Sequence, residues 1–182
     1  MPNIFLTADH HFDHTNILSY CNRPFKSVEE MNAVLVERWN SVVSRNDIVY
    51  YLGDFAFGQD PAIFRRRLNG QICLIPGSHD SAYSNKLLKA NFGFIKLQYL
   101  LKKVTTPVWL CHYQMRTWPQ RWQGAWHAYA HSHGKIDYLT YPELSMDVGV
   151  DAWNFYPVSY EQFQEKMNHK INLLNSKGAL NA

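Results

Sequence analysis

Aspartate and histidine residues recur in this sequence directly after short apolar runs that are typical of buried strands. Imidazole and carboxylate groups are ligands for transition-metal ions, and they must converge from several parts of a chain to hold one. Because strand ends can supply that convergence, the pattern predicts a metal site. Five segments share it: Asp9-His10-His11, Gly53-Asp54, Gly77-Ser78-His79-Asp80, His112 and His131-Ser132-His133.

Two of these segments can each supply two ligands to one site. Side chains at positions i and i+2 of an extended chain point the same way, which pairs Asp9 with His11 and His131 with His133. His10, between the first two, is expected to point elsewhere.

The first half of the sequence predicts alternating strands and helices, with the helices separating these segments. Ser27-Val28-Glu29-Glu30 is a capping box and predicts a helix to about Val43. Asp60-Pro61 and Asn69-Gly70 mark the start and stop of a second helix. A weaker helix is predicted over 83–90.

Strands dominate the second half. The sequence predicts one strand over 94–101, a turn at Lys102-Lys103 and another strand over 107–111. A second capping box, Ser159-Tyr160-Glu161-Gln162, predicts a closing helix. Its apolar face carries Phe163, Met167, Ile171 and Leu174.

Length and composition predict one globular domain over 1–182. The chain is 46% hydrophobic and 15% aromatic, which argues against disorder, and its net charge of +3 is far from the dense basic footprint of a dedicated nucleic-acid binder. The three cysteines show no C-x-x-C spacing. With neither a signal peptide nor a membrane span expected, we place the protein in a reducing cytoplasm.

Taken in order, the five segments resemble the motifs of calcineurin-like metallophosphoesterases of the small bacterial and phage type. That family's pattern runs D-x-H, G-D, G-N-H-D, H and G-H-x-H, and the resemblance covers most of the chain. One such motif is weak evidence, but five in order are strong. The resemblance implies an α/β (α+β) fold, a two-sheet β-sandwich flanked by helices in four αββα layers.

The resemblance also implies a two-metal site and a reaction. The first metal is expected to take Asp9, His11, Asp54 and His133. The second is expected to take Asp54 as a bridge, Ser78, His112 and His131. His79 is implied to assist the leaving group or stabilise phosphate charge, with Asp80 orienting it. A metal-activated hydroxide would then hydrolyse a phosphomonoester or phosphodiester, and manganese, iron, zinc, cobalt and nickel suit these ligands alike.

Ser78 departs from the family pattern, which has asparagine at this position. A serine hydroxyl is shorter and a poorer ligand, so occupancy of the second metal site is in question. Ser78 could be a natural variant that ligates weakly or through water, an engineered substitution, or a mark of lost activity; weakened catalysis ranks above complete loss. Ala130 stands where the family often has glycine, a smaller change.

Other candidate residues have competing structural interpretations. Lone histidines usually belong to a core or a surface, which is the role expected for His10, His127 and His169. His14 is equally consistent with lining the pocket and with a structural role, and Arg23 with reaching phosphate and with stabilising its loop. Arg116 lies among Trp118, Trp122 and Trp126, which could form a substrate wall but are better explained as packing a loop onto the core.

Several functions remain open at this point. The favoured one is a phosphoesterase acting on a phosphate ester, with nucleotides and cyclic nucleotides among the candidate substrates. The alternatives are a binding or scaffold protein with a degraded phosphoesterase pocket, and a nuclease, since a nucleic-acid partner is conceivable but not favoured. The sequence does not define an oligomeric state.

Overall fold

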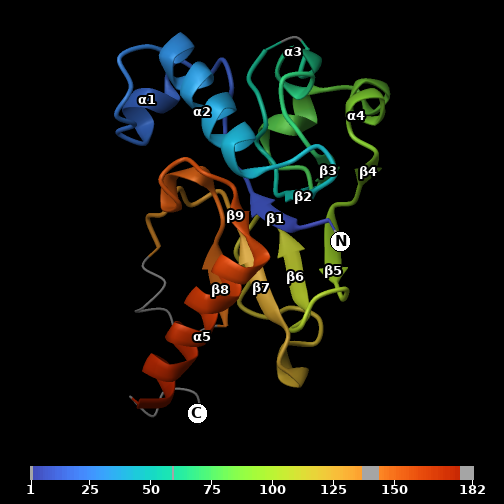
Figure 1. Cartoon of the computed structure of the whole chain (residues 1–182), viewed down its shortest axis with the longest axis vertical. Helices are drawn as coiled ribbons and strands as arrows, with labels where there is room; N and C mark the ends of the chain where they lie inside the picture. Colours follow the sequence, from blue (N-terminus) through green and yellow to red (C-terminus); the bar gives the residue numbers. More distant parts are fainter. Residues whose placement is uncertain (1, 59, 137–143, 177–182) are drawn as a thin grey trace.

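The computed structural model describes residues 2–58, 60–136 and 144–176, which form two β-sheets with helices around them (Figure 1). The first sheet has the strand order β4-β3-β2-β1-β9 and the second has the order β5-β6-β7-β8. The first sheet comprises β1 (Ile4–Thr7), β2 (Ile48–Tyr51), β3 (Gln71–Leu74), β4 (Phe94–Ile95) and β9 (Val158–Ser159). The second comprises β5 (Gln98–Leu101), β6 (Val108–Cys111), β7 (Trp126–Tyr129) and β8 (Ser145–Asp147).

Parallel pairing brings the carboxyl ends of the central strands to a common edge in each sheet. Strands β1 to β4 run parallel, with Ile4 opposite Ile48 and Ile48 opposite Gln71, and only β9 is antiparallel. In the second sheet β6, β7 and β8 are parallel and β5 is antiparallel. Loops that leave β1, β2, β3, β6 and β7 can therefore meet.

Both predicted N-terminal caps form, although the Glu30 carboxylate accepts from the amide of Lys26 (2.7 Å) and not from that of Ser27. Ser27 accepts a hydrogen bond from the Glu30 amide (3.2 Å) at the start of α2 (Val28–Val42). Ser159 and Gln162 exchange backbone and side-chain hydrogen bonds (3.0 and 3.2 Å) before α5 (Tyr160–Ser176). Local side-chain chemistry fixes both helix starts.

Two predicted elements differ in the structure. The helix expected after Asp60-Pro61 is a single turn, α3 (Ala62–Arg65), because the Arg65 side chain donates to the carbonyls of Leu68 and Gly70 and holds the chain in a turn. The single strand expected over 94–101 divides, since β4 pairs with β3 and β5 pairs with β6. The chain changes sheet between them.

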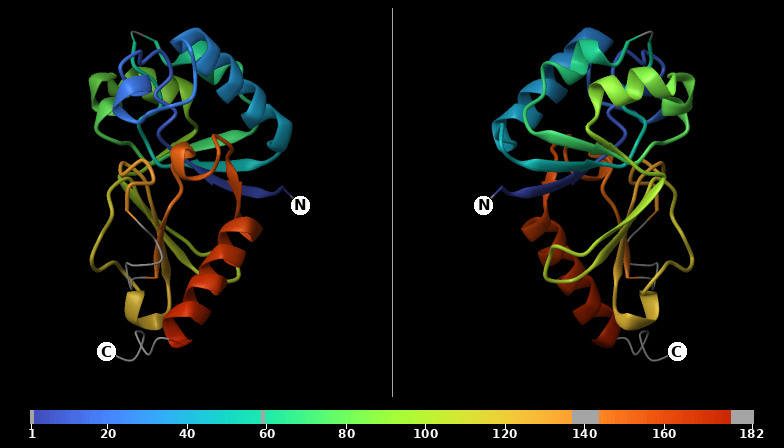
Figure 2. Two further views of the ribbon diagram at one scale, coloured as in Figure 1. Left: turned by 90° about the vertical axis from the view of Figure 1, so that its left-hand side faces the viewer. Right: turned by 90° about the vertical axis from the view of Figure 1, so that its right-hand side faces the viewer.

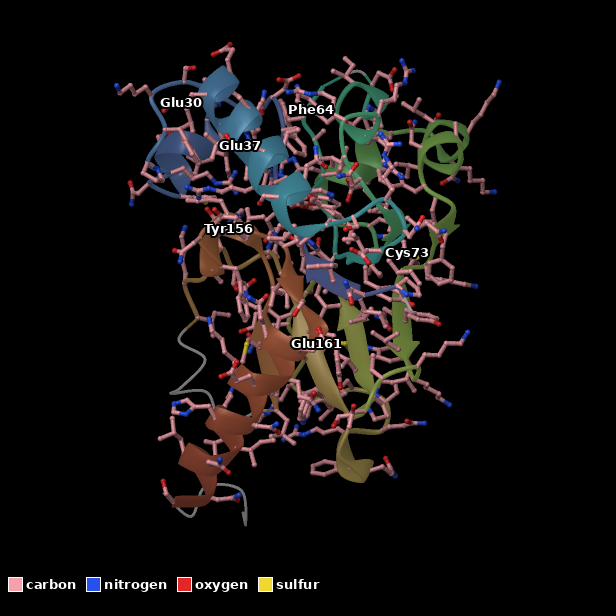
Figure 3. The ribbon with its side chains drawn as sticks, in the orientation of Figure 1. Glu30, Glu37, Phe64, Cys73, Tyr156 and Glu161 are labelled. Atoms are coloured by element: carbon pink, nitrogen blue, oxygen red, sulfur yellow. The ribbon has the colours of Figure 1, made fainter. Side chains whose placement is uncertain are left out.

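The first sheet separates two hydrophobic cores. One face packs on α2 through Met31, Leu35 and Trp39, and the core on that side includes Phe64 of α3 (labelled in Figure 3), which stacks on Phe12 with ring centroids 4.4 Å apart. The short helices α1 (Ile17–Tyr20) and α4 (Asn85–Asn91) lie on the same side (Figure 2).

The other core lies between the sheets. Leu6 and Leu52 of the first sheet and Leu110 and Ala128 of the second meet there. Phe163 and Met167 of α5 join this same core, so α5 closes the space between the sheets. The mixed α/β arrangement of two sheets flanked by helices is confirmed, whereas the four-layer order is not. Within the described chain no helix is long and apolar enough to cross a membrane.

Candidate metal centre

Five loops converge where the parallel strands of both sheets end. The Asp9 amide donates to the Gly53 carbonyl (3.0 Å) and the His11 amide to the Asp54 carbonyl (3.1 Å), which joins the first two loops. The His131 amide donates to Oδ2 of Asp9 (2.8 Å), which ties the second sheet to the first. The predicted ligand residues are thereby brought together from segments far apart in the sequence.

The potential ligand atoms fall into overlapping groups that could each hold a metal ion. Asp54 lies between two of them, because its Oδ2 is 3.7 Å from Nε2 of His11 and 3.5 Å from Nε2 of His112. In each group the ligand atoms lie within 4.8 Å of one another. Three groups contain the predicted residues: Asp9 with His11 and His133; His11 with Asp54 and His79; and Asp54 with His112 and His131.

Three buried atoms in this cluster have no hydrogen-bond partner among the described residues. They are Oδ1 of Asp9, Nε2 of His11 and Nε2 of His112. Buried polar atoms are nearly always paired, because an unpaired one costs about 1–3 kcal/mol. All three are atoms of types that bind transition-metal ions, so the residues fit a metal centre.

The imidazole rings are oriented by hydrogen bonds at their other nitrogen. Nδ1 of His112 is 2.6 Å from the Leu52 carbonyl and Nδ1 of His133 is 2.8 Å from Oδ2 of Asp151. A carbonyl or carboxylate partner requires Nδ1 to donate, and it therefore directs Nε2 toward the cluster.

The charge balance of the cluster favours cations. Burial raises the pKa of Asp9 to about 7, despite the opposing effect of His133 and His112. Burial opposes protonation of His112, but the nearby Asp54 and Asp9 carboxylates outweigh it and raise the pKa of His112 to about 9. A proton on His112 therefore supplies positive charge beside the Asp54 and Asp9 carboxylates, as a bound cation would.

Most of the predicted ligands adopt left-handed backbone conformations. The φ angles are +58° at Asp9, +51° at His11, +57° at Asp54, +68° at His131 and +49° at His133. Such a conformation is uncommon for residues other than glycine and costs on the order of 1 kcal/mol or more, although Asp and His tolerate it better than most. Strained backbone of this kind concentrates at functional sites.

Two glycines let the second and third loops approach each other. A Cβ at Gly53 would overlap the backbone of Gly77, and Gly53 has a φ of +88°. A Cβ at Gly77 would overlap Oδ1 of Asp54 and would lie 2.6 Å from Cε1 of His112. Both glycines are therefore required by the close packing of the candidate ligand loops.

We expect Gly77→Ala to destabilise the fold by about 1–3 kcal/mol, the usual cost of overpacking, and to weaken metal binding in parallel. Urea unfolding and metal titration would measure the two effects. Gly93→Ala is the matched control, because a Cβ at Gly93 meets nothing within 4 Å. Equal stability of the two variants would contradict the prediction.

Arg23 stabilises the loops that carry the site, and its guanidinium does not face the cluster. Its side chain is 5% exposed and donates to both oxygens of Asp151 (2.8 and 2.7 Å). It also donates to the carbonyls of Asp9 (2.6 Å) and His10 (2.8 Å), and its last N–H faces Sδ of Met31 (3.3 Å). With all five donors in use, the guanidinium has none left for phosphate, and the loop-stabilising role is the one observed.

Asp80 is placed differently from the orientation role implied for it. Its buried carboxylate accepts from the amides of Asp54 (2.8 Å), Phe55 (3.1 Å) and Gly77 (2.8 Å), and no hydrogen bond joins it to the His79 ring in the described chain. The reason is the 3-10 turn η1 (His79–Ala82), which turns Asp80 into the core. Asp80 thus organises the loops that carry Asp54 and Ser78.

Two further aspartates of the site were missed by the sequence analysis. Asp147 accepts from the Ser132 hydroxyl (2.6 Å) and from the amides of Gly134 and Gly149 (2.9 and 2.7 Å), which shapes the last histidine loop. Asp151 orients His133. Asp147 ends strand β8, so the strand-end pattern could have found it, but Asp151 lies in the 3-10 turn η3 (Val150–Ala152) and has no such signal.

Ser78 and His79 lie beside Asp54. The Ser78 hydroxyl is 3.2 Å from Oδ2 and 3.4 Å from Oδ1 of Asp54, and the His79 amide donates to Oδ1 (2.9 Å). The His79 ring is partly exposed and is 5.0 Å from the His11 ring, so it lies at the mouth of the cluster.

His14 belongs to the site region. Its Nδ1 is 3.3 Å from Nδ1 of His11, and its ring stacks on Phe57 with centroids 4.4 Å apart. A His14 that accepts at Nδ1 makes His11 donate there, which again leaves Nε2 of His11 free toward the cluster. His14 therefore positions a candidate ligand.

The remaining candidates lie away from the cluster. Arg116 is exposed, and its carbonyl accepts from Arg121. His10 and His127 are fully buried and His169 is exposed, as expected for structural histidines. Trp118 and Trp126 pack against the core, but Trp122 is 81% exposed in η2 (Arg121–Gln123) and does not.

Comparison with known proteins finds similar proteins over most of the chain. The uncharacterized protein MJ1445 of Methanocaldococcus jannaschii is 34% identical over 169 residues, spanning 88% of this chain and 89% of its own. The crystal structure of the protein of unknown function AQ665 from Aquifex aeolicus has a TM-score of 0.73 at 20% identity, covering 91% of this chain and 99% of that one, which shows a shared fold.

YfcE, a phosphoesterase from E. coli, aligns with a TM-score of 0.38 at 17% identity over 72% of this chain and 70% of its own. No family model matches the chain.

Proposed function

The chain belongs to the family of the Methanocaldococcus jannaschii protein, and from the geometry of the site we propose that it is a metal-dependent phosphoesterase. The observation that carries the proposal is the set of unpaired, buried atoms of Asp9, His11 and His112 around the Asp54 carboxylate. All three atoms are of types that bind transition-metal ions, and they lie in one cluster.

Two adjacent ligand sets are supported by the grouping of these side chains. Asp9, His11, Asp54 and His133 would hold one divalent ion. Asp54, His112, His131 and Ser78 would hold the other. Asp54 serves both sets because its carboxylate lies between His11 and His112. When bound, the two ions supply Lewis-acid charge and lower the pKa of a water.

The chain's own residues supply binding, orientation and proton transfer. His131, which is exposed at the rim, and His79 at the mouth can bind the phosphate oxygens of an ester. His79 is the group placed to give a proton to the leaving oxygen, because it lies beside Asp54 at the mouth of the cluster and its ring makes no hydrogen bond in the described chain. Asp80, Asp147 and Arg23 hold the loops in place beneath it.

Turnover of 4-nitrophenyl phosphate and bis(4-nitrophenyl) phosphate with added manganese would test the proposal. We expect metal-dependent hydrolysis that His112→Ala removes, since this substitution deletes a ligand of the second set. His169→Ala, at an exposed position on α5, is the matched control and should leave the rate unchanged. Metal binding without turnover of any ester would favour a binding protein that has kept only the pocket.

Ser78→Asn is expected to raise occupancy of the second metal and the rate of ester hydrolysis. The Ser78 hydroxyl now lies against the Asp54 carboxylate, while a longer amide oxygen could reach past it to a metal. Elemental analysis of the purified variants and steady-state kinetics would measure the change. Two tightly bound metals in the unaltered chain, with neither quantity changed by the substitution, would contradict it.

The proposed site does not distinguish between types of phosphate ester. Phosphomonoesters, phosphodiesters, nucleotides and cyclic nucleotides all present the anionic group that two cations bind. A panel of these compounds with several metals, and digestion of single-stranded and duplex nucleic acids, would separate a small-molecule phosphoesterase from a nuclease.

A further inference from the structure

An apolar hollow opens directly beside His79. It has a volume of about 370 Å³, and its walls are Ala56, Phe57, Ala82 and Tyr83, with Ser78 and His79 at the end nearest the metal cluster. Among the described residues that line it there is no Asp, Glu, Lys or Arg. Its size lies at the lower end of the range for small-molecule pockets, about 300–1,000 Å³.

Phe57 forms a fixed, half-exposed wall of this hollow. The side chain is 52% exposed, yet its ring is stacked on His14 with an interplanar angle of 15°, and it makes a T-shaped contact with the His79 ring at a centroid distance of 5.8 Å. The Phe57 amide donates to the Phe12 carbonyl (2.7 Å), which anchors the backbone. An exposed aromatic ring held this way is preorganised for contact with another flat group.

The opposite wall is also held in place. The Tyr83 hydroxyl donates to the Ala56 carbonyl (3.0 Å), which joins the two sides of the hollow, and Tyr83 itself is 8% exposed. The hollow is therefore part of the folded site and not a gap between mobile side chains.

We propose that this hollow binds the leaving group of the substrate and selects a flat, uncharged ring on the ester oxygen. The inference rests on the proposed function, because it uses His79 as the residue that faces the leaving oxygen. A phosphate held at the metal cluster with its leaving oxygen toward His79 directs the attached group into the hollow. There an aromatic ring can pack against Phe57, whereas a charged or strongly hydrated group would lose water without gaining a partner.

Binding of two non-hydrolysable anions to the manganese-loaded protein tests this selection without relying on turnover. Phenylphosphonate and methylphosphonate carry the same metal-binding group and differ in the ring, and calorimetry gives the Kd of each. We expect phenylphosphonate to bind about tenfold more tightly, as one aromatic contact with its burial allows. Phe57→Ala should reduce the ratio of the two Kd values to near one.

Two exposed aromatic residues provide controls for the loss of a ring. Trp122→Ala, in η2 and 81% exposed, should keep the ratio. Tyr113→Ala should also keep it, although the Tyr113 ring centroid lies 4.8 Å from those of His112 and His131. The proposal would be overturned if Tyr113→Ala brought the ratio of the two Kd values to near one while Phe57→Ala left it unchanged.

The possible failures are distinguishable. If both anions bind with equal Kd and Phe57→Ala changes neither, the leaving-group hollow is wrong while the phosphoesterase site stands. If neither anion binds to the manganese-loaded protein, the proposed function fails and the hollow fails with it.

Discussion

Asp54→Asn should abolish metal-dependent stabilisation of the protein and reduce ester hydrolysis more than any other single conservative change. Asp54 lies between the two ligand sets, and its replacement by a neutral amide removes the bridging charge from both. Asparagine tolerates the left-handed backbone at this position, so the variant is expected to fold. The loss of rate should exceed the about 10- to 100-fold cost that is typical of residues behind the ligands.

Melting curves with and without manganese, followed by kinetics, would measure this effect. The unaltered protein should gain about 2.7 kcal/mol of stability at a metal concentration of about 100 times Kd. The control is Asp13→Asn, because Asp13 has a φ of +60° and is exposed outside the ligand groups, so it should keep the gain. A manganese-induced shift of equal size in Asp54→Asn would refute the bridging role.

Arg23→Met is expected to lower the free energy of unfolding by about 3–5 kcal/mol, the range for breaking a buried ion pair. The substitution leaves the Asp151 carboxylate without its guanidinium and frees the carbonyls of Asp9 and His10. Urea unfolding would measure the loss. Arg45→Met, at an exposed position, is the matched control and should stay within about 0.5 kcal/mol.

A double-mutant cycle with Asp151→Asn separates the ion pair from general damage. Because the two side chains contact each other, their effects should be non-additive by at least about 0.5 kcal/mol. Additive losses would mean that Arg23 stabilises the fold through its carbonyl contacts alone.

Elements with local causes were predictable from the sequence, and elements decided by distant contacts were not. The capping boxes at Ser27 and Ser159 need only residues three positions apart, so their helix starts were correct. The division of 94–101 depends on β4 pairing with β3 and β5 with β6, which no local pattern records. The early end of α3 depends on Arg65 reaching the Leu68 and Gly70 carbonyls.

The candidate site divides in the same way. The strand-end rule found the residues whose side chains enter the cluster, and the structure brings them together; that they bind metals stays a prediction. The rule could not assign Arg23, because only the folded chain shows that its donors are occupied. It also could not find Asp151, whose importance comes from its contacts with Arg23 and His133.

The left-handed backbone at Asp9, His11, Asp54, His131 and His133 restricts how this centre can change. A left-handed backbone is strongly unfavourable for a β-branched residue and unfavourable for glutamate, whereas it is less unfavourable for aspartate, asparagine and histidine. The loops thus select the chemical type of their own ligands before any ion is present. A designer who copied these side chains onto regular strands would obtain the residues without the centre, because the turns must be transplanted with them.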